Sequence, residues 1–253
     1  MVFYYIINIY INNKTMAKKG FVKKYVSENY PNLHRELIDL IYTNGYDYVD
    51  MGEAGKWATC NVGATSPEES GLYFQWGDTQ GYTKDQVMNG EKIFNLHNYK
   101  FFSEGFTKYC NDERAGEGGF TDNLTTLKLA DDAAHAYMGG AWRMPTKDEF
   151  AKLFDLCKHS WVYDYEGTGV NGIELVLPDD MSKTLFFPRT GYAYERGEIS
   201  DKDYTYMWSS SLNTSDPSGQ GLVYINTSVD SPSFRPFDRG WGFPVRGILG
   251  VGK

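Results

Sequence analysis

The 253-residue sequence predicts an α+β domain that follows a helical N-terminal segment. Two observations indicate this class. Apolar residues recur at helical spacing between residues 31 and 45 and again between residues 131 and 159, whereas short β-prone runs bounded by turn residues dominate from residue 174 onward. Helices that precede a run of strands, instead of alternating with them, favour an α+β arrangement over repeated βαβ units.

Residues 1–16 are interpreted as an N-terminal extension. Residues 2–11 form an apolar run, but no basic residue precedes it and no small-residue cleavage site follows it, so it is a poor signal peptide. Its β-branched and aromatic composition is more typical of a strand or a packing peptide. Met16 opens a hydrophilic stretch, which leaves open that residues 1–15 are an upstream extension of the reading frame.

Residues 17–45 are predicted to be a helical attachment segment. Asn32 and Gly45 supply the start and stop signals of a helix of about three turns. Its apolar face is formed by Leu33, Leu37, Leu40 and Ile41. We expect this segment to tether the following domain to other subunits of a larger assembly, or to a second copy of the chain.

Two further helices are predicted near the centre of the chain. Asp131 or Asp132 can cap a short helix over residues 133–138, which Gly139 would end. Thr146, followed three residues later by Glu149, forms a capping-box pattern ahead of an apolar helical face. Strands are then predicted over residues 174–177, 184–187, 204–210, 221–226 and 242–248.

Charge is unevenly spread along the chain. The first 27 residues carry five lysines and no acidic residue or arginine. Because the whole chain carries −8, the remaining residues carry a net charge of −13. This net negative charge disfavours binding of residues 28–253 to the phosphate backbone of a nucleic acid, so we expect no nucleic-acid partner. No apolar run reaches the length of a transmembrane helix.

The cysteines and histidines give no metal-binding pattern. The three cysteines are far apart, the four histidines are scattered, and no CxxC pair is present. We therefore expect neither a metal nor another cofactor. These residues are Cys60, Cys110, Cys157, His34, His97, His135 and His159.

Five blocks of sequence, taken together and in this order, resemble the C-type-lectin-like domains of the sulfatase-modifying-factor, or formylglycine-generating-enzyme, superfamily. The resemblance is to the paralogous surface and phage-associated type abundant in gut Bacteroidetes, and it covers roughly residues 46–250. The blocks are residues 48–79 (YVDMGEAGKWATCNVGATSPEESGLYFQWGDT), 131–150 (DDAAHAYMGGAWRMPTKDEF), 186–192 (FFPRTGY), 206–211 (YMWSSS) and 242–248 (GFPVRGI).

The resemblance implies a C-type-lectin-like fold over residues 46–253, with a small twisted antiparallel sheet, two main helices and extensive loops. Most of the matched residues have chemistry suited to building such a frame, since a guanidinium in an apolar strand can bind several loop carbonyls. We predict structural roles for Trp142, Arg143, Pro145, Thr146, Glu149, Trp208 and Arg246.

The enzymes of this superfamily use chemistry that this sequence lacks. Formylglycine-generating relatives bind copper through a C-terminal cysteine pair, but no cysteine follows Cys157. Iron-dependent relatives use two histidines and a carboxylate, and the last histidine is His159. The EPN, QPD and WND motifs of calcium-dependent lectins are also absent from the sequence. We therefore predict a non-enzymatic protein with no catalytic residues.

Residues 204–241 are the predicted ligand-binding region. Aromatic, amide, carboxylate and guanidinium side chains alternate there with Gly, Ser and Pro, a mixture typical of recognition surfaces. About half of the aromatic residues are expected to fill a loop-rich core instead, with Trp208 and Val223 inward and Tyr224 outward. The predicted ligand-binding residues are Tyr204, Tyr206, Asn213, Tyr224, Asn226, Asp230, Phe234, Arg235, Asp238, Arg239 and Trp241.

Two functions remain open from the sequence. The first is an adhesin or receptor-binding domain on a phage tail or bacterial surface, which recognises a cell-surface glycan or protein. The second is a structural virion or envelope component that contacts only other subunits. Relatives diversified by retroelements vary the C-terminal region, so diversification of residues 204–241 is a further hypothesis.

Overall fold

The computed structural model describes residues 31–215, 221–226 and 233–250. The chain divides into two compact units, Met1–Gly45 and Tyr46–Lys253. In the first unit, helix α3 (Pro31–Thr43) forms where helical spacing predicts it, and Gly45 follows with a left-handed φ of 81°. Two apolar residues near the end of α3, Leu40 and Ile41, are about half exposed.

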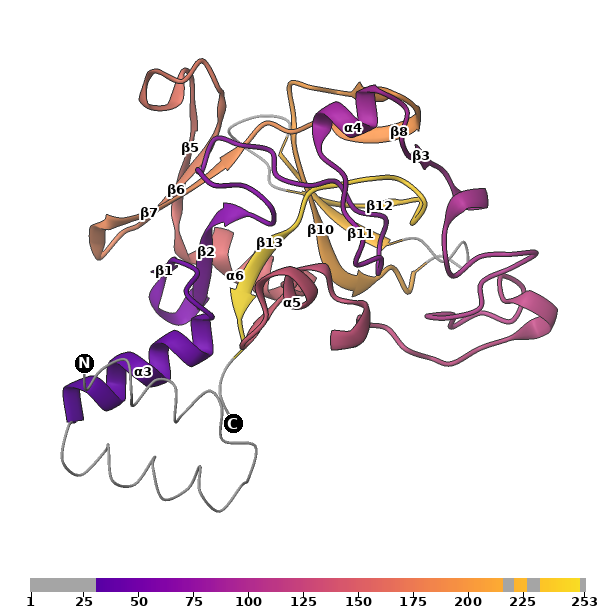
Figure 1. Ribbon diagram of the computed structural model, residues 1–253, viewed down its shortest axis with the longest axis horizontal. Coiled ribbons are helices and arrows are strands. Elements are labelled where there is room, and N and C mark those ends of the chain that lie inside the picture. Colours follow the sequence, from indigo (N-terminus) through magenta and orange to yellow (C-terminus); the bar gives the residue numbers. More distant parts are fainter. Residues whose placement is uncertain (1–30, 216–220, 227–232, 251–253) are drawn as a thin grey trace, which may run out of the picture. The chain divides into compact units, whose positions relative to one another are not determined.

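The second unit is an α+β domain built mainly of short antiparallel strands (Figure 1). Its helices are α4 (Lys84–Met88), α5 (Ala133–Met138) and α6 (Lys147–Leu156). Its strands are β1 (Tyr48–Asp50), β2 (Lys56–Asn61), β3 (Ile93–Phe94), β4 (Trp142–Arg143), β5 (Lys158–Val162), β6 (Gly172–Leu177), β7 (Asp180–Pro188), β8 (Tyr192–Arg196), β9 (Glu198–Ser200), β10 (Thr205–Leu212), β11 (Gly221–Asn226), β12 (Ser233–Phe237) and β13 (Arg246–Leu249).

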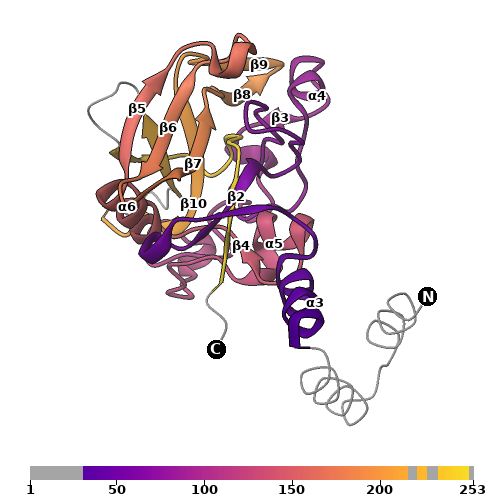
Figure 2. The same cartoon turned by 90° about the vertical axis from the view of Figure 1, so that its left-hand side faces the viewer.

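The strands form four small sheets, all with antiparallel pairing. Their orders are β1-β2-β13-β4, β10-β11-β12, β3-β8-β9 and β5-β6-β7. Figure 2 shows β5, β6 and β7 side by side as one layer. Strand β2, near the start of this unit, pairs with β13, near its end, so the two ends of the domain lie in one sheet.

The predicted central helices are confirmed, caps included. The side chain of Asp132 accepts from the backbone N–H of His135 to cap α5, which ends at Gly139 with φ 66°. Thr146 and Glu149 form the reciprocal capping box of α6. These short-range patterns needed only residues three or four apart, which is why the sequence was sufficient to predict them.

Three of the five predicted strands lie within β6, β7 and β11, and the predicted strand 204–210 lies within β10 except that it begins one residue early. The fifth, residues 242–248, was predicted too long, because β13 begins only at Arg246. Pro244 has no N–H to give to a ladder, and the residues before it make isolated bridges instead, Gly242 with Ala193 and Phe243 with Phe74. The early strands β1 and β2 were not predicted as separate elements.

The main core lies between α6, the β2–β13 pair and the β6–β7 hairpin. Phe150 and Leu153 of α6 are fully buried there against Trp57 of β2 and Phe187 of β7. Trp208 of β10 is also fully buried, and its indole N–H donates to the carbonyl of Phe74 at 2.8 Å. The burial of Trp208 confirms its predicted inward position. The hydrogen bond satisfies the indole N–H, which a buried tryptophan usually requires.

The residues between 142 and 149 that were predicted to be structural also make contacts that hold the fold together. Trp142 is fully buried, and the carbonyl of Pro145 accepts from the backbone N–H of Ser210 at 2.8 Å. The guanidinium of Arg143 binds both carboxylate oxygens of Glu149. The start of α6 is therefore fixed to β10 and to the strand that precedes the helix.

Arg246 is a fully buried charged residue whose guanidinium donates to four acceptors. Its guanidinium is fully buried and donates to the Asn61 Oδ1 at 2.9 Å, to the carbonyls of Ala58 and Phe186 at 2.9 Å each, and to the carbonyl of Thr59. Burial lowers the pKa of Arg246 to about 9, so the group stays charged at neutral pH. One side chain thus joins β13 to β2 and β7.

Replacement of Arg246 by Met should destabilise the domain by about 3 kcal/mol or more, because several buried acceptors lose their donor at once. The matched control is Arg235→Met, which changes an exposed arginine of β12 and should cost less than about 0.5 kcal/mol. Urea unfolding of both variants measures the difference. Equal stability of the two variants would contradict the role given to Arg246.

Glu149→Gln should lower the free energy of unfolding by about 1–2 kcal/mol at pH 7, with the loss shrinking in acid. Burial alone would raise the pKa of Glu149, but hydrogen bonds from Arg143 and Thr146 outweigh it and hold that pKa below the ordinary 4.5. Stabilisation is therefore complete above pH 4.5 and disappears as the pH falls through the folded-state pKa. Unfolding curves at pH 7 and near pH 3 test this, and a constant difference would refute it.

Candidate functional site

Aromatic rings from four separate parts of the second unit meet at its surface. We call the partly exposed rings the aromatic platform. Two more rings, Tyr206 and Phe243, are buried beneath it. The platform consists of Tyr192 and Tyr194 of β8, Tyr204 before β10, Phe237 of β12 and Trp241 before β13.

Four of the platform rings, those of Tyr192, Tyr194, Phe237 and Trp241, contact one another, and Tyr204 contacts the buried ring of Tyr206 at 6.2 Å. Trp241 stacks on Tyr192 with ring centroids 5.0 Å apart and an interplanar angle of 8°. Tyr194 and Phe237 tilt against the same indole at 4.7 and 5.3 Å. Tyr194 is 36% exposed, and the other platform rings are half-buried. The surface therefore offers contiguous aromatic area that a ligand can cover.

Strand periodicity explains how the short strand β8 supplies two of these rings. Side chains alternate between the faces of a strand, so Tyr192 and Tyr194 share one face while Ala193 points to the other. Ala193 is fully buried in a small core with Phe94 and Ile199. The β8–β9 hairpin is thus held by its apolar face and displays tyrosines from the opposite one.

The turn before Trp241 is anchored by Arg239. This guanidinium is 1% exposed and donates to the carbonyls of Lys108 and Tyr109 at 3.2 and 3.0 Å. It also lies 3.8 Å from the ring centroid of Phe106. The prediction that Arg239 contacts a ligand is therefore wrong for this structure, because its donors serve buried carbonyls.

Gly240 fits the same turn where no side chain could. A Cβ at this position would come within 2.4 Å of the backbone of Asn95. The carbonyl of Gly240 accepts from the side-chain amide of Gln75 at 2.8 Å, and its N–H donates to the Oδ1 of Asp238 at 2.7 Å. The backbone that presents Trp241 is therefore held on both sides before any ligand arrives.

The hydroxyls of Tyr192 and Tyr206 have pKa values raised above the ordinary value, so both remain protonated at physiological pH. Tyr206 donates to the Oδ2 of Asp201 at 3.1 Å. Burial, and next the negative charge of Asp201, raise the pKa of both Tyr206 and Tyr192 above the ordinary value. Burial likewise raises the pKa of Asp238. The site therefore offers neutral O–H groups beside an exposed carboxylate, that of Asp201.

The platform unites only part of the predicted ligand-binding set. Tyr204 and Trp241 belong to it, but Tyr206, at 3% exposure, lies under it, so its predicted ligand contact is corrected to a supporting role. Asp238 shapes the anchored turn, and Arg235 is exposed on β12.

The remaining members of the set lie elsewhere or outside the description. Asn213 and Phe234 line a separate groove, and Asn213 is itself 95% buried. Tyr224 and Asn226 lie in β11, whose side chains are outside the described part, as is that of Val223. Asp230 falls outside the described residues altogether.

Three platform residues were not predicted from the sequence: Tyr192, Tyr194 and Phe237. The alternation of tyrosines around Ala193 was a usable signal, since period-2 spacing marks one face of a strand. Phe237 gave no such signal, because only the fold brings β12 beside β8.

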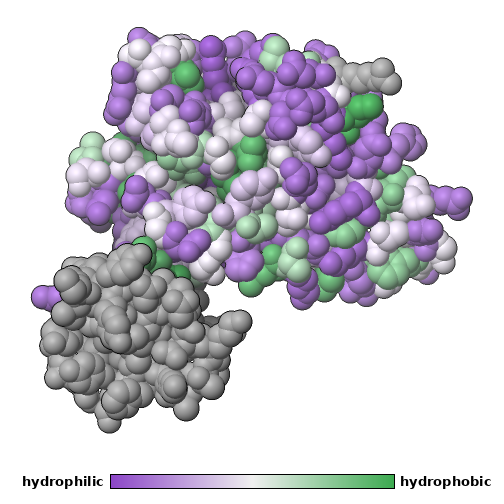
Figure 3. Space-filling view, viewed as in Figure 1, coloured by the Kyte–Doolittle hydropathy of each residue, from purple (hydrophilic) through white to green (hydrophobic). Residues whose placement is uncertain are grey.

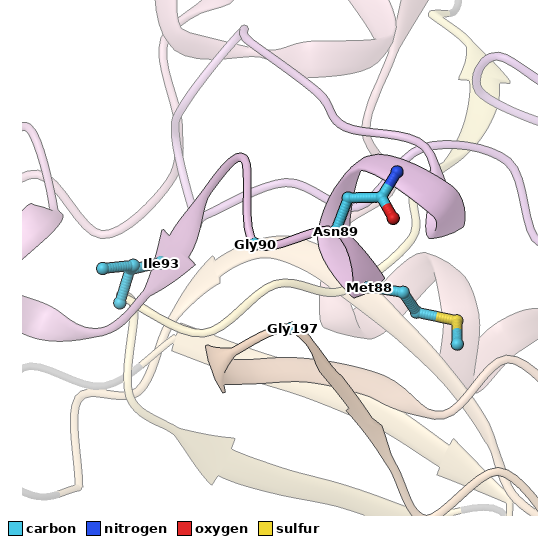
Figure 4. Close-up of a pocket in the computed structure, with 5 residues that line it drawn as sticks. All are labelled: Met88, Asn89, Gly90, Ile93 and Gly197. Carbon is cyan, nitrogen blue, oxygen red and sulfur yellow. The ribbon is translucent and has the colours of Figure 1, made fainter.

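A second feature of the surface is a wide hollow of about 570 Å³ at the turn between β8 and β9 (Figure 4). Its lining consists of Met88, Asn89, Gly90, Ile93 and Gly197. In Figure 4 the side chains of Met88 and Ile93 point in opposite directions, and two of the five residues are glycines. The five residues that line it do not converge on a common point, so we assign it no ligand.

Within the described part of the chain, no group of three or more His, Cys, Asp or Glu residues could hold a metal ion. No helix in the same ranges is both long and apolar enough to cross a membrane. On the face drawn in Figure 3, hydrophobic residues lie in small groups between hydrophilic ones.

Comparisons with family models, with curated proteins and with solved structures each gave no match to this chain. The function must therefore be argued from the residues and geometry of the molecule itself.

Gly240→Ala should destabilise the domain by about 1–3 kcal/mol, because the added methyl group meets backbone atoms that cannot move aside cheaply. Gly250→Ala is the comparison and should cost less, since the nearest atom to its added Cβ, the carbonyl oxygen of Ala141, would lie 3.3 Å away and needs to shift by only a few tenths of an ångström. Urea unfolding reports the stability of each variant, and near-ultraviolet circular dichroism reports the packing of the platform rings. Unchanged stability and spectrum in Gly240→Ala would show that the turn is not tightly held.

Proposed function

We propose that this protein is a non-enzymatic ligand-binding domain, an adhesin or receptor-binding module of a phage tail or bacterial surface, which recognises a cell-surface glycan or protein through the aromatic platform. The observation that carries the proposal is the stacked and partly exposed pair Tyr192–Trp241, which Tyr194 flanks and whose indole follows an anchored turn. Tyrosine and tryptophan rings supply large contact area at low entropic cost, both against sugars and against proteins.

The proposed fold is C-type-lectin-like. It is supported by the sequence resemblance, by the α+β class with small antiparallel sheets, and by the frame roles of Trp142, Trp208 and Arg246. Residues 17–45 are the proposed tether to other subunits. The proposed absence of catalysis rests on the sequence, in which no cysteine follows Cys157 and no histidine follows His159.

Binding is tested on a glycan array and on intact bacterial cells with the full-length chain. Trp241→Ala and Tyr194→Ala should each weaken saturable binding by about thirtyfold, the loss expected when a central aromatic anchor is removed. The control is Tyr163→Ala, which removes a tyrosine that directly follows β5 and is 76% exposed. This variant should bind like the wild type.

Thermal unfolding of each variant separates lost binding from lost folding. Equal binding by Trp241→Ala, Tyr194→Ala and Tyr163→Ala would refute the platform. If the folded protein binds neither the array nor the cells, the alternative, a structural virion or envelope component, replaces the proposal.

A further inference from the structure

A polar groove lies apart from the platform, between the start of α6, the end of β10 and strand β12. Its volume is about 430 Å³, within the range of small-ligand sites. We infer that this groove is a second ligand-binding site, one that takes a neutral saccharide unit. Its rim carries five hydroxyl side chains, those of Thr125, Thr126, Ser211, Thr214 and Ser215.

The walls of the groove are fixed by backbone and side-chain hydrogen bonds. Thr126 bridges to Ser211, and the N–H of Leu212 donates to the carbonyl of Thr125 at 2.9 Å. The N–H of Lys147, at the start of α6, donates to the Oγ of Ser211 at 3.0 Å. Two chain segments and a helix are thereby locked together, so the described walls exist without a ligand.

Phe234 and Pro236 of β12 supply the apolar part of the lining. Phe234 is half-buried, and its ring lies 6.1 Å from that of Phe150 in the main core. A partly exposed ring beside many hydroxyl groups matches the two faces of a sugar, whose C–H groups pack on apolar surface while its hydroxyls form hydrogen bonds.

The polar groups suit a neutral ligand better than a charged one. Among the described residues that line the groove, one side chain is cationic, Lys147, and one is anionic, Asp148; the two are adjacent on the first turn of α6 and both are exposed. Asn213 is 95% buried, and both hydrogen bonds described at it, from the N–H and hydroxyl of Ser215, use its Oδ1. Asn213 therefore holds Ser215 in place at the rim of the groove.

The groove and the platform share no residue. Alternation along β12 separates them, because Phe234 and Pro236 share one face of the strand, whereas Arg235 and Phe237 share the other. The inference therefore does not depend on the platform, and a ligand can occupy one site while the other is empty.

The test is a titration of the full chain with the methyl glycosides of glucose, mannose, galactose and N-acetylglucosamine, followed by backbone amide NMR. At least one glycoside should give saturable shifts at Thr126, Ser211 and Lys147. The blocking variant Thr126→Phe should lose these shifts, whereas Thr107→Phe, which changes an exposed threonine outside the groove, should keep them.

A second comparison separates this site from the proposed function. Trp241→Ala should leave the groove shifts and their midpoint unchanged, so a failure of the platform does not remove the groove. The inference is overturned if none of the four glycosides shifts the groove amides of the folded protein, if the shifts survive in Thr126→Phe, or if Trp241→Ala abolishes them.

Discussion

The buried guanidinium of Arg246 is the contact on which the frame depends. A charged group without solvent is tolerated only when its donors are satisfied, and here β2, β7 and the Asn61 side chain provide the acceptors. Those acceptors belong to two different sheets, because β2 lies in the sheet β1-β2-β13-β4 and β7 in the sheet β5-β6-β7. Arg246, itself in β13, therefore joins two sheets that share no strand.

Arg239, a second buried arginine, also binds backbone carbonyls, and it does so beside the partly exposed Trp241. Arg239 binds the carbonyls of residues 108 and 109 and packs on Phe106, and its own carbonyl accepts from the N–H of Trp76 at 3.0 Å. The indole two residues later is displayed from a segment that is already ordered. Preorganisation of this kind matters for recognition, because a ligand then does not bear the entropy of fixing the turn.

The sequence predicted the parts of this structure that depend on neighbours in the chain. The capping box of Thr146 and Glu149 and the inward position of Trp208 could be inferred from spacing and residue type. Strands β1 and β2 were missed as elements: β1 has only three residues, and β2 is completed by its pairing with the distant β13, which local propensity does not show.

The candidate site shows the same limit more clearly. Arginines are almost never fully buried unless paired, so composition favoured an exposed Arg239, and only the fold shows the carbonyls that it binds. The stacking of Tyr192 on Trp241 joins residues far apart in sequence, and no periodicity links them. Residue type therefore predicted Tyr204 and Trp241 as surface aromatics but missed Tyr192 and Tyr194. It also could not distinguish the rings of the platform from the buried Tyr206 beneath them.

We expect a ligand to contact Trp241 on a frame that does not rearrange when the ligand binds. Fluorine NMR of the protein labelled with 5-fluorotryptophan tests this directly, with the tightest-binding glycan from the array as the added ligand. The resonance of Trp241 should shift, while those of the fully buried Trp57, Trp76, Trp142 and Trp208 stay in place. A stationary Trp241 signal on saturation would contradict ligand contact at Trp241, and comparable shifts at the four buried indoles would contradict a rigid frame.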